Sequence, residues 1–137
     1  MIWDHIKNFN REENWGNPDK INGALLLLLD KLREIIGHPI HINEGYNDKG
    51  HAEKSQHYLG NAVDFYIEGS PLKEAYELLK DALIELNVWH NVGLGIYPHW
   101  NNPGFHLDIR GEMSRWGRIK KNGKEEYVKF GEALEKA

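Results

Sequence analysis

Histidine and aspartate residues suited to metal binding stand in the segment from Gly50 to Asp64. His57 offers an imidazole nitrogen and Asp64 a carboxylate oxygen, and zinc accepts both as ligands. Gly60 lies between them and permits a backbone turn that a side chain would disfavour. The same residues also fit a capped loop followed by a solvated aspartate, so their interpretation depends on the rest of the chain.

A catalytic zinc site needs a third protein ligand and an open position for water. The chain has eight histidines. Only His106 lies in a predicted strand with a carboxylate two positions later on the same face. Two residues along a strand span roughly 7 Å. His106 could therefore bind an ion while Asp108 stays close without binding it.

Composition excludes several classes of protein. The 137 residues, 40% of them hydrophobic and 28% charged, predict one domain over residues 1–137 with one core. A net charge of −4 gives no reason to expect nucleic acid as a partner. The absence of cysteine excludes disulfides, thiol catalysis and thiolate metal sites. Any metal must be held by histidines and carboxylates.

Neither a membrane span nor a secretory signal is predicted. The longest apolar run, Ala24–Leu29, is far shorter than the roughly 20 residues that cross a bilayer. The N-terminus has no basic segment followed by an apolar one. We expect a monomer that is made in the cytoplasm and has no membrane partner.

Periodicity predicts the elements that position the candidate ligands. Helices are expected over residues 21–36, 71–86 and 131–136, and strands over 39–44, 61–67, 92–97 and 105–110, with a hairpin over 116–128. Asn17 or Asp19 is expected to cap the first helix, whose five consecutive leucines predict a helix nearly surrounded by core. Ser70 and Pro71 are expected to begin the second. This order predicts an α+β fold with a mostly antiparallel central sheet flanked by helices.

Three segments together resemble the peptidase M15 family. They are Ser55-Gln-His-Tyr-Leu-Gly-Asn-Ala-Val-Asp64, Gly93-Leu-Gly-Ile-Tyr-Pro98 and Phe105-His-Leu-Asp-Ile-Arg110. This family comprises zinc D-Ala-D-Ala carboxypeptidases and phage endolysin peptidases, and it shares a fold with the hedgehog signalling domain. The resemblance covers nearly the whole chain. It implies the hedgehog/DD-peptidase fold and peptidoglycan stem peptides as substrate.

The resemblance also implies roles for individual residues. It implies His57, Asp64 and His106 as ligands of Zn²⁺, and Ser55 near the terminal carboxylate of the substrate. The expected reaction is metal-assisted hydrolysis of amide bonds in cell-wall peptides. Release to the cell wall by phage-type lysis would agree with the missing secretory signal.

Further candidate substrate-binding residues are Tyr46, His51 and Arg110. His51 is expected either at the mouth of the cleft or exposed on a loop. For Arg110, a substrate clamp and a structural ion pair are both open. Many relatives have Gly-Tyr-Arg where this chain has Gly-Tyr46-Asn47, so an arginine expected to hold substrate is absent.

The residues just before His106 depart from the family's pattern for the general base. Related peptidases carry a glutamate or a second histidine shortly before the last ligand, where this chain has Pro103 and Gly104. Asp108 is the best placed candidate for the base. Its alternatives are to orient a ligand histidine or to bind the ion directly.

The sequence leaves two questions of function open. One is the bond cleaved, since D-Ala-D-Ala carboxypeptidase, L-Ala-D-Glu endopeptidase and cross-link cleavage all agree with such a site. The other is whether the domain is an enzyme at all. The altered residues suggest, as an alternative, a catalytically inactive zinc-containing binding module of the same fold.

Overall fold

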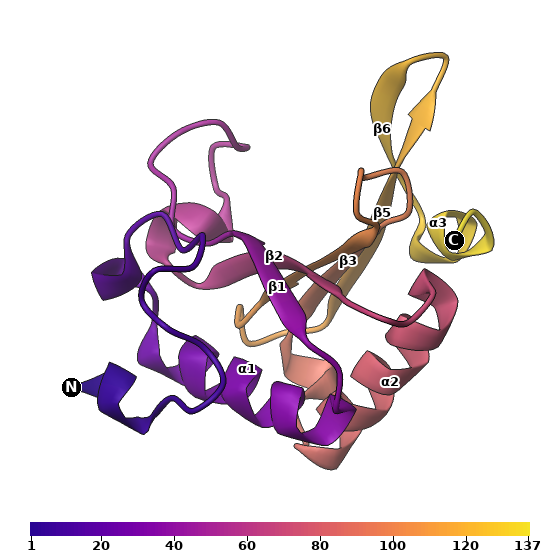
Figure 1. Cartoon of the computed structure of the whole chain (residues 1–137). Helices are drawn as coiled ribbons and strands as arrows, with labels where there is room; N and C mark the ends of the chain where they lie inside the picture. The colour runs from indigo at the N-terminus through magenta and orange to yellow at the C-terminus, as the bar shows by residue number, and fades with distance from the viewer.

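The computed structural model describes residues 1–137 as a six-stranded sheet with helices against one face (Figure 1). The strands are β1 (Ile40–Glu44), β2 (Ala62–Ile67), β3 (Gly93–Tyr97), β4 (Gly104–Asp108), β5 (Ser114–Lys121) and β6 (Lys124–Val128). The helices are α1 (Gly23–Ile36), α2 (Leu72–Glu85) and α3 (Phe130–Glu135), with short 3-10 helices η1 (Ile2–His5), η2 (Pro18–Lys20), η3 (Gln56–Leu59) and η4 (Trp89–Asn91). The predicted α+β class is confirmed.

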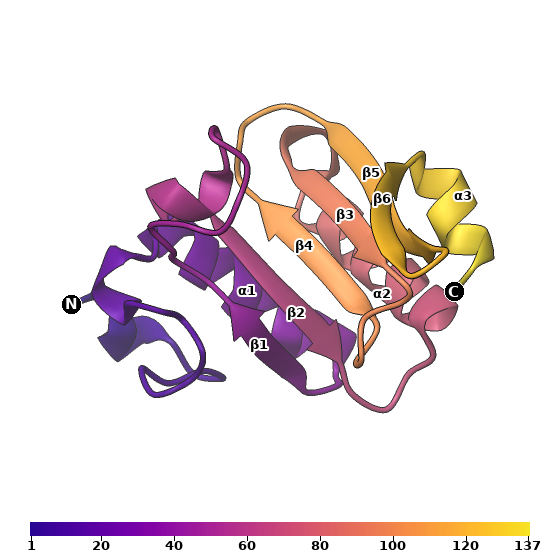
Figure 2. The ribbon, with the colours of Figure 1, turned by 90° about the horizontal axis from the view of Figure 1, so that it is seen from above.

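The strands follow the order β1-β2-β4-β3-β5-β6 (Figure 2). Neighbouring strands are antiparallel except β3 and β5, which are parallel. This exception arises because the segment over residues 109–113 carries the chain across the beginning of β3, at Gly93, before β5 begins. The sheet is therefore mixed but mostly antiparallel, as predicted.

One face of the sheet packs against α1 and α2 (Figure 1). Alternation along the central strands directs Val63 and Phe65 of β2, and Phe105 and Leu107 of β4, into this layer, where all four are fully buried. The hydrophobic core that they join contains 26 residues. None of the helices has the length and apolar character that crossing a membrane requires.

The structure corrects three expectations about the helices. The cap of α1 is Asn22, whose side chain accepts a hydrogen bond from the Ala24 amide, because Asn17 instead caps η2. Helix α2 begins one residue later than predicted, since Ser70 makes no capping bond to it and Pro71 takes the N-cap position. The leucine run also leaves one side of α1 open, with Leu27 39% exposed.

The loop that carries His57 is fixed by Gly60. This glycine ends η3 with a φ of 72°, in the left-handed region, which confirms the special backbone predicted there. A Cβ at Gly60 would lie only 1.8 Å from the carbonyl oxygen of Lys20. The Asn22 amide also donates to the Gly60 carbonyl at 2.9 Å. The N-terminal segment and η3 are thus packed backbone to backbone.

Candidate metal centre

A row of aligned residues crosses the sheet on the face away from α1 and α2. Register pairs Glu44 of β1 with Asp64 of β2, Asp64 with His106 of β4, His106 with Gly95 of β3, and Gly95 with Trp116 of β5. Directly opposite residues on neighbouring strands have Cβ atoms roughly 5 Å apart. The pairing of strands therefore brings Asp64 and His106 together although 42 positions separate them in sequence.

His57 reaches the same place from η3. The Ser55 hydroxyl caps η3 by accepting a hydrogen bond from the His57 amide at 3.2 Å. The His57 Nδ1–H donates to the Gly45 carbonyl at 2.7 Å. Because a carbonyl can only accept, Nδ1 carries the proton and Nε2 is left for another partner. That Nε2 lies 3.2 Å from Asp64 Oδ1.

The three predicted ligands converge on one point. His106 Nδ1 lies 3.0 Å from the same Asp64 oxygen that faces His57. One ligand atom from each of the three residues lies within 4.8 Å of the others. In a tetrahedral zinc site with bonds of about 2.0–2.1 Å, ligand atoms are roughly 3.4 Å apart. The donor types and their spacing therefore fit a zinc ion, with room for a fourth ligand on the cleft side.

Asp108 lies behind His106. Its carboxylate accepts from His106 Nε2 at 2.7 Å, which leaves Nδ1 of that ring facing Asp64. Arg110 binds both oxygens of Asp108, with Nε at 2.8 Å and a terminal nitrogen at 2.7 Å. Asp108 is fully buried. This geometry agrees better with orienting His106 than with accepting a proton from water, because both oxygens are already engaged.

Charge within the cluster shifts the pKa of each candidate ligand. Burial alone lowers the pKa of His106, but hydrogen bonds to Asp108 and Asp64 outweigh it and raise that pKa to about 9. Burial raises the pKa of Asp64, yet hydrogen bonds from the two histidines bring it to about 2. The pKa of His57 is also raised, because Asp64 outweighs the effect of burial. Without an ion, hydrogen bonds between the histidine nitrogens and the Asp64 carboxylate therefore link the three residues.

Two glycines of β3 give the site its space. A Cβ at Gly95 would lie 2.6 Å from the Trp116 indole nitrogen, and one at Gly93 would lie 2.6 Å from both Asp108 oxygens. Trp116 can therefore lie over the sheet, where its ring centroid is 5.0 Å from that of His106. The Gly-x-Gly pattern was visible in the sequence, but its partners become evident only from the sheet register.

Glu44 joins the site although sequence alternation did not predict it. With Ile40 and Ile42 facing the core, a regular strand would turn Glu44 the same way. A register shift between Ile42 and Glu44 places Glu44 opposite Asp64 instead. Its carboxylate contacts His51 Nε2, and Glu44, His51 and His57 form a second group of potential metal ligands.

The predicted substrate-binding residues divide between two locations. Ser55, His51 and Arg110 line a cleft of about 450 Å³ that also contains the three candidate ligands. Tyr46 is not brought there, because its backbone amide pairs with Trp15 and its hydroxyl contacts Lys20 at 3.5 Å. Tyr46 therefore lies outside the residues that line this cleft.

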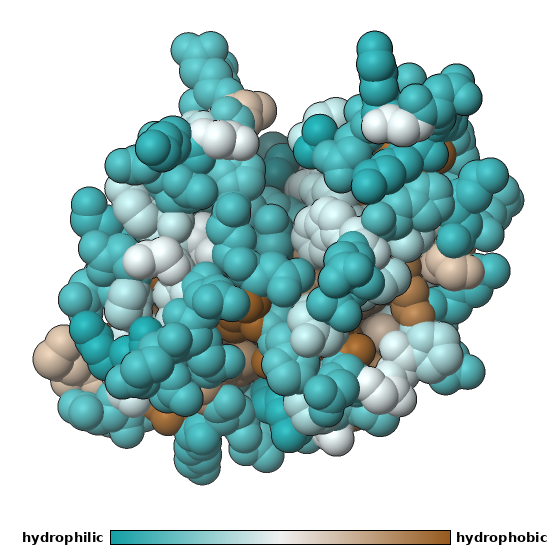
Figure 3. All heavy atoms as spheres, turned by 45° about the horizontal axis from the view of Figure 1, so that its top comes forward, coloured by the Kyte–Doolittle hydropathy of each residue, from teal (hydrophilic) through white to brown (hydrophobic).

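The walls of the cleft come from two projections of the chain. Figure 3 shows the surface hollowed between them, and Figure 1 shows them as the loop before η3 and the β5–β6 hairpin. The hairpin side adds aromatic and cationic residues that sequence analysis did not assign to the site, namely Tyr97, Trp116, Arg118 and Tyr127. Trp100, in the turn between β3 and β4, also lines the cleft.

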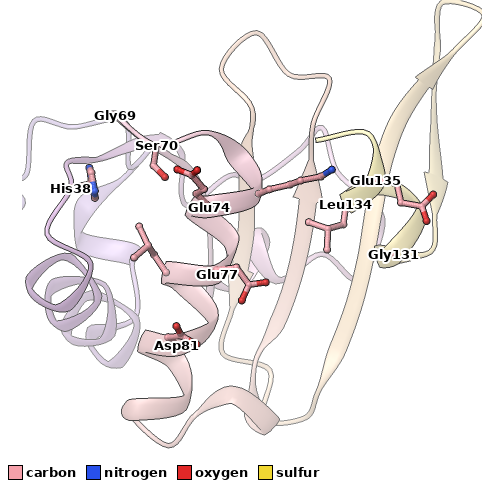
Figure 4. A pocket seen from close by; sticks show the side chains of 11 residues that line it. His38, Gly69, Ser70, Glu74, Glu77, Asp81, Gly131, Leu134 and Glu135 are labelled. Atoms are coloured by element: carbon pink, nitrogen blue, oxygen red, sulfur yellow. The ribbon is translucent and has the colours of Figure 1, made fainter.

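A larger hollow of about 790 Å³ lies between α2 and α3, away from this cluster (Figure 4). Its side chains include Glu74, Glu77, Asp81 and Glu135. These carboxylates are spread along two helices, and no three of them gather their oxygens as metal ligands do. The chemistry of the chain is therefore concentrated in the smaller cleft.

Comparison with known proteins adds one finding. A family model described as peptidoglycan L,D-endopeptidase MepK, of the peptidase M15 group, matches residues 5–116. The matched range includes Ser55, the three candidate ligands and Trp116. No curated protein matches the chain at a significant level.

Proposed function

The chain belongs to the peptidase M15 family, and from this membership we propose that it is a zinc-dependent endopeptidase of peptidoglycan peptides. The family match indicates a peptidoglycan peptidase of the M15 type. The description of the matching family supports an endopeptidase that cleaves between L- and D-residues. Of the three cleavage specificities that the sequence left open, this description favours the endopeptidases over the D-Ala-D-Ala carboxypeptidase.

One observation carries the proposal. Nε2 of His57, Nδ1 of His106 and a carboxylate oxygen of Asp64 converge at distances of 3.0 and 3.2 Å. Two neutral imidazoles and one carboxylate leave a site of net charge near +1 when a divalent ion binds. When bound, the ion supplies Lewis acidity that polarises the scissile carbonyl and lowers the pKa of water to about 7.

The chain's own residues orient these ligands. Gly45 accepts from His57 Nδ1, and Asp108 accepts from His106 Nε2, so that each ring presents its other nitrogen to the ion. Arg110 forms an ion pair with Asp108, and its positive charge keeps that carboxylate ionised. The ring of His51 is stacked on that of His57, with centroids 4.3 Å apart, and is paired with Glu44, which makes His51 a candidate to receive a proton in the cleft.

Endopeptidase and carboxypeptidase activity place different demands on the cleft. The hollow lies between the loop before η3 and the β5–β6 hairpin (Figure 3), and the three candidate ligands line it. A carboxypeptidase would need a barrier that stops the peptide one residue past the scissile bond, so the products of digestion distinguish the two activities.

Mass spectrometry of peptidoglycan fragments tests the proposal. Purified peptidoglycan is incubated with zinc-loaded protein, with chelated protein, and with the Asp64→Ala variant. We expect new peptide termini at L–D bonds with the zinc-loaded protein alone. Release of D-alanine only would identify a carboxypeptidase instead. No products with zinc bound would favour the inactive binding module.

A further inference from the structure

The cleft extends beyond the part of the chain that the family model matches. That match ends at residue 116, while Arg118 and Tyr127 of the β5–β6 hairpin also line the cleft. These two residues are paired across the hairpin. Alternation along β5 places Arg118 on the same face as Trp116, roughly 7 Å further along the strand. Trp116 itself packs against the candidate ligand His106.

Arg118 has a donor that no protein group uses. Its guanidinium lies 4.9 Å from the centre of the Tyr127 ring, and one terminal nitrogen pairs with Glu125 at 3.2 Å. Its Nε is buried and has no hydrogen-bond partner. A buried donor without a partner is unfavourable. Because Nε is closed to solvent while the side chain as a whole is 36% exposed, an acceptor that enters the cleft would bind the terminal nitrogens.

The other cations near the cleft are less suited to bind an acceptor. Arg110 already binds both oxygens of Asp108. Arg115 points to the opposite face of β5, where its terminal nitrogens donate to the backbone carbonyls of Val92 and Trp89; its Nε is buried without a partner there, away from the cleft. Lys54 lines the cleft from the opposite wall but is exposed on a loop. Among these cations, Arg118 combines a position in the cleft lining with a partly exposed guanidinium whose ion pair with Glu125 uses one terminal nitrogen.

We propose that Arg118 forms a subsite for a free carboxylate of the substrate peptide. A guanidinium presents a planar fork of donors that matches a carboxylate. Arg118 lies roughly 7 Å beyond Trp116 along β5, which an extended peptide at about 3.5 Å per residue spans with about two residues. The subsite would replace the arginine that is absent at Asn47. This inference rests on the proposed peptidase function.

Peptidoglycan stem peptides offer two sources of such a carboxylate, the α-carboxylate of D-glutamate and the C-terminus. Three synthetic pentapeptides, L-Ala-γ-D-Glu-L-Lys-D-Ala-D-Ala and its two singly amidated forms, distinguish them. For the zinc-loaded protein we expect one amidation to lower kcat/KM about tenfold, mainly through KM. Arg118→Gln should lower kcat/KM for the acid peptide by the same factor, with no further loss on amidation.

Lys121→Gln is the matched control. It removes one positive charge from the same hairpin, but Lys121 lies on the opposite face of β5, where it pairs with Glu132 of α3 at 3.2 Å. It should keep the full preference for the acid peptide. Equal losses for acid and amide peptides in Arg118→Gln would overturn the proposal, as would a wild-type protein indifferent to both amidations.

Calorimetry on the chelated protein separates this inference from the proposed activity. If no peptide is cleaved but the wild type binds the acid form about tenfold more tightly than one amide, and Arg118→Gln abolishes that difference, the subsite stands and the peptidase function fails. If peptides are cleaved but binding shows no such preference, the peptidase function stands and the subsite fails.

Discussion

Phe105 and His106 are neighbours on β4, and both are buried, with exposed fractions of 0% and 7%. They nevertheless belong to two different environments. Phe105 points into the core formed with α1 and α2, where many apolar contacts share the stabilisation. His106 points to the other face, where its two nitrogens have one partner each, Asp64 and Asp108.

The two faces therefore differ in how they tolerate change. Burial of apolar area is non-directional, so the core depends on volume and packing. The polar face depends on a few hydrogen bonds that direct particular atoms toward one point. We expect substitutions on the core face to lower stability with little effect on the chemistry, and substitutions on the polar face to do the reverse.

The largest effect is expected from His106→Ala. This change removes one of three ligands, and the Lewis acidity supplied by a metal contributes several kcal/mol to the barrier. We expect hydrolysis of peptidoglycan to fall by roughly 10³-fold or more, together with loss of bound zinc. Elemental analysis and digestion assays on one preparation measure both. Zinc retained at one equivalent would contradict the ligand assignment.

Phe105→Ala should affect the other face. Truncating a buried phenylalanine costs about 3–5 kcal/mol, so the free energy of unfolding in urea should fall by this amount. The protein that remains folded should still bind one zinc ion. A loss of zinc affinity as large as that of His106→Ala would show that the two faces are not separable.

Asp108→Asn tests the orienting role within the polar face. An amide keeps the shape of the carboxylate but weakens the hydrogen bond that fixes the ring of His106. Loss of such a partner typically lowers metal affinity or activity by about 10–100-fold. Competition with a zinc-binding dye measures the affinity. Unchanged affinity with abolished turnover would instead support Asp108 as the base.

The polar face should also make stability dependent on pH. The pKa of His106 is raised to about 9. Its contribution to the metal-free protein is therefore complete below about 6.5 and is lost as pH rises through 9. The pKa of Asp64 is lowered to about 2, so its contribution is present above 3.8 and lost as pH falls through 2.

Zinc competes with these protons, so its effect on the melting temperature should grow between pH 6 and pH 9. Thermal unfolding with zinc and with chelator, at several pH values, measures that effect. The His106→Ala variant provides the control and should show no such trend. A zinc effect that shrinks with rising pH would contradict the cluster as described.

Much of the fold followed from local patterns. The strands predicted over 61–67 and 105–110 carry Asp64 and His106, and the hairpin predicted over 116–128 is β5 and β6. Residues placed by irregular features were missed. Glu44 reaches the site through a register shift, and Arg118 does so through the position of β5 beside β3. Neither feature leaves a periodic signal in the sequence.

The sequence also could not decide the role of Asp108. The spacing of His106 and Asp108 permitted a base, an orienting partner or a ligand. Only the positions of both Asp108 oxygens, held by Arg110 and His106, favour one of these. For Tyr46, the motif suggested a substrate contact, and the structure places its hydroxyl beside Lys20 instead of in the cleft lining.

Crystallography of the zinc-loaded protein, with anomalous data collected at the zinc absorption edge, tests the central claim most directly. We predict one strong anomalous peak about 2.0–2.2 Å from His57 Nε2, His106 Nδ1 and an Asp64 oxygen. A peak between Glu44 and His51, or no peak near His106, would contradict the proposed metal centre.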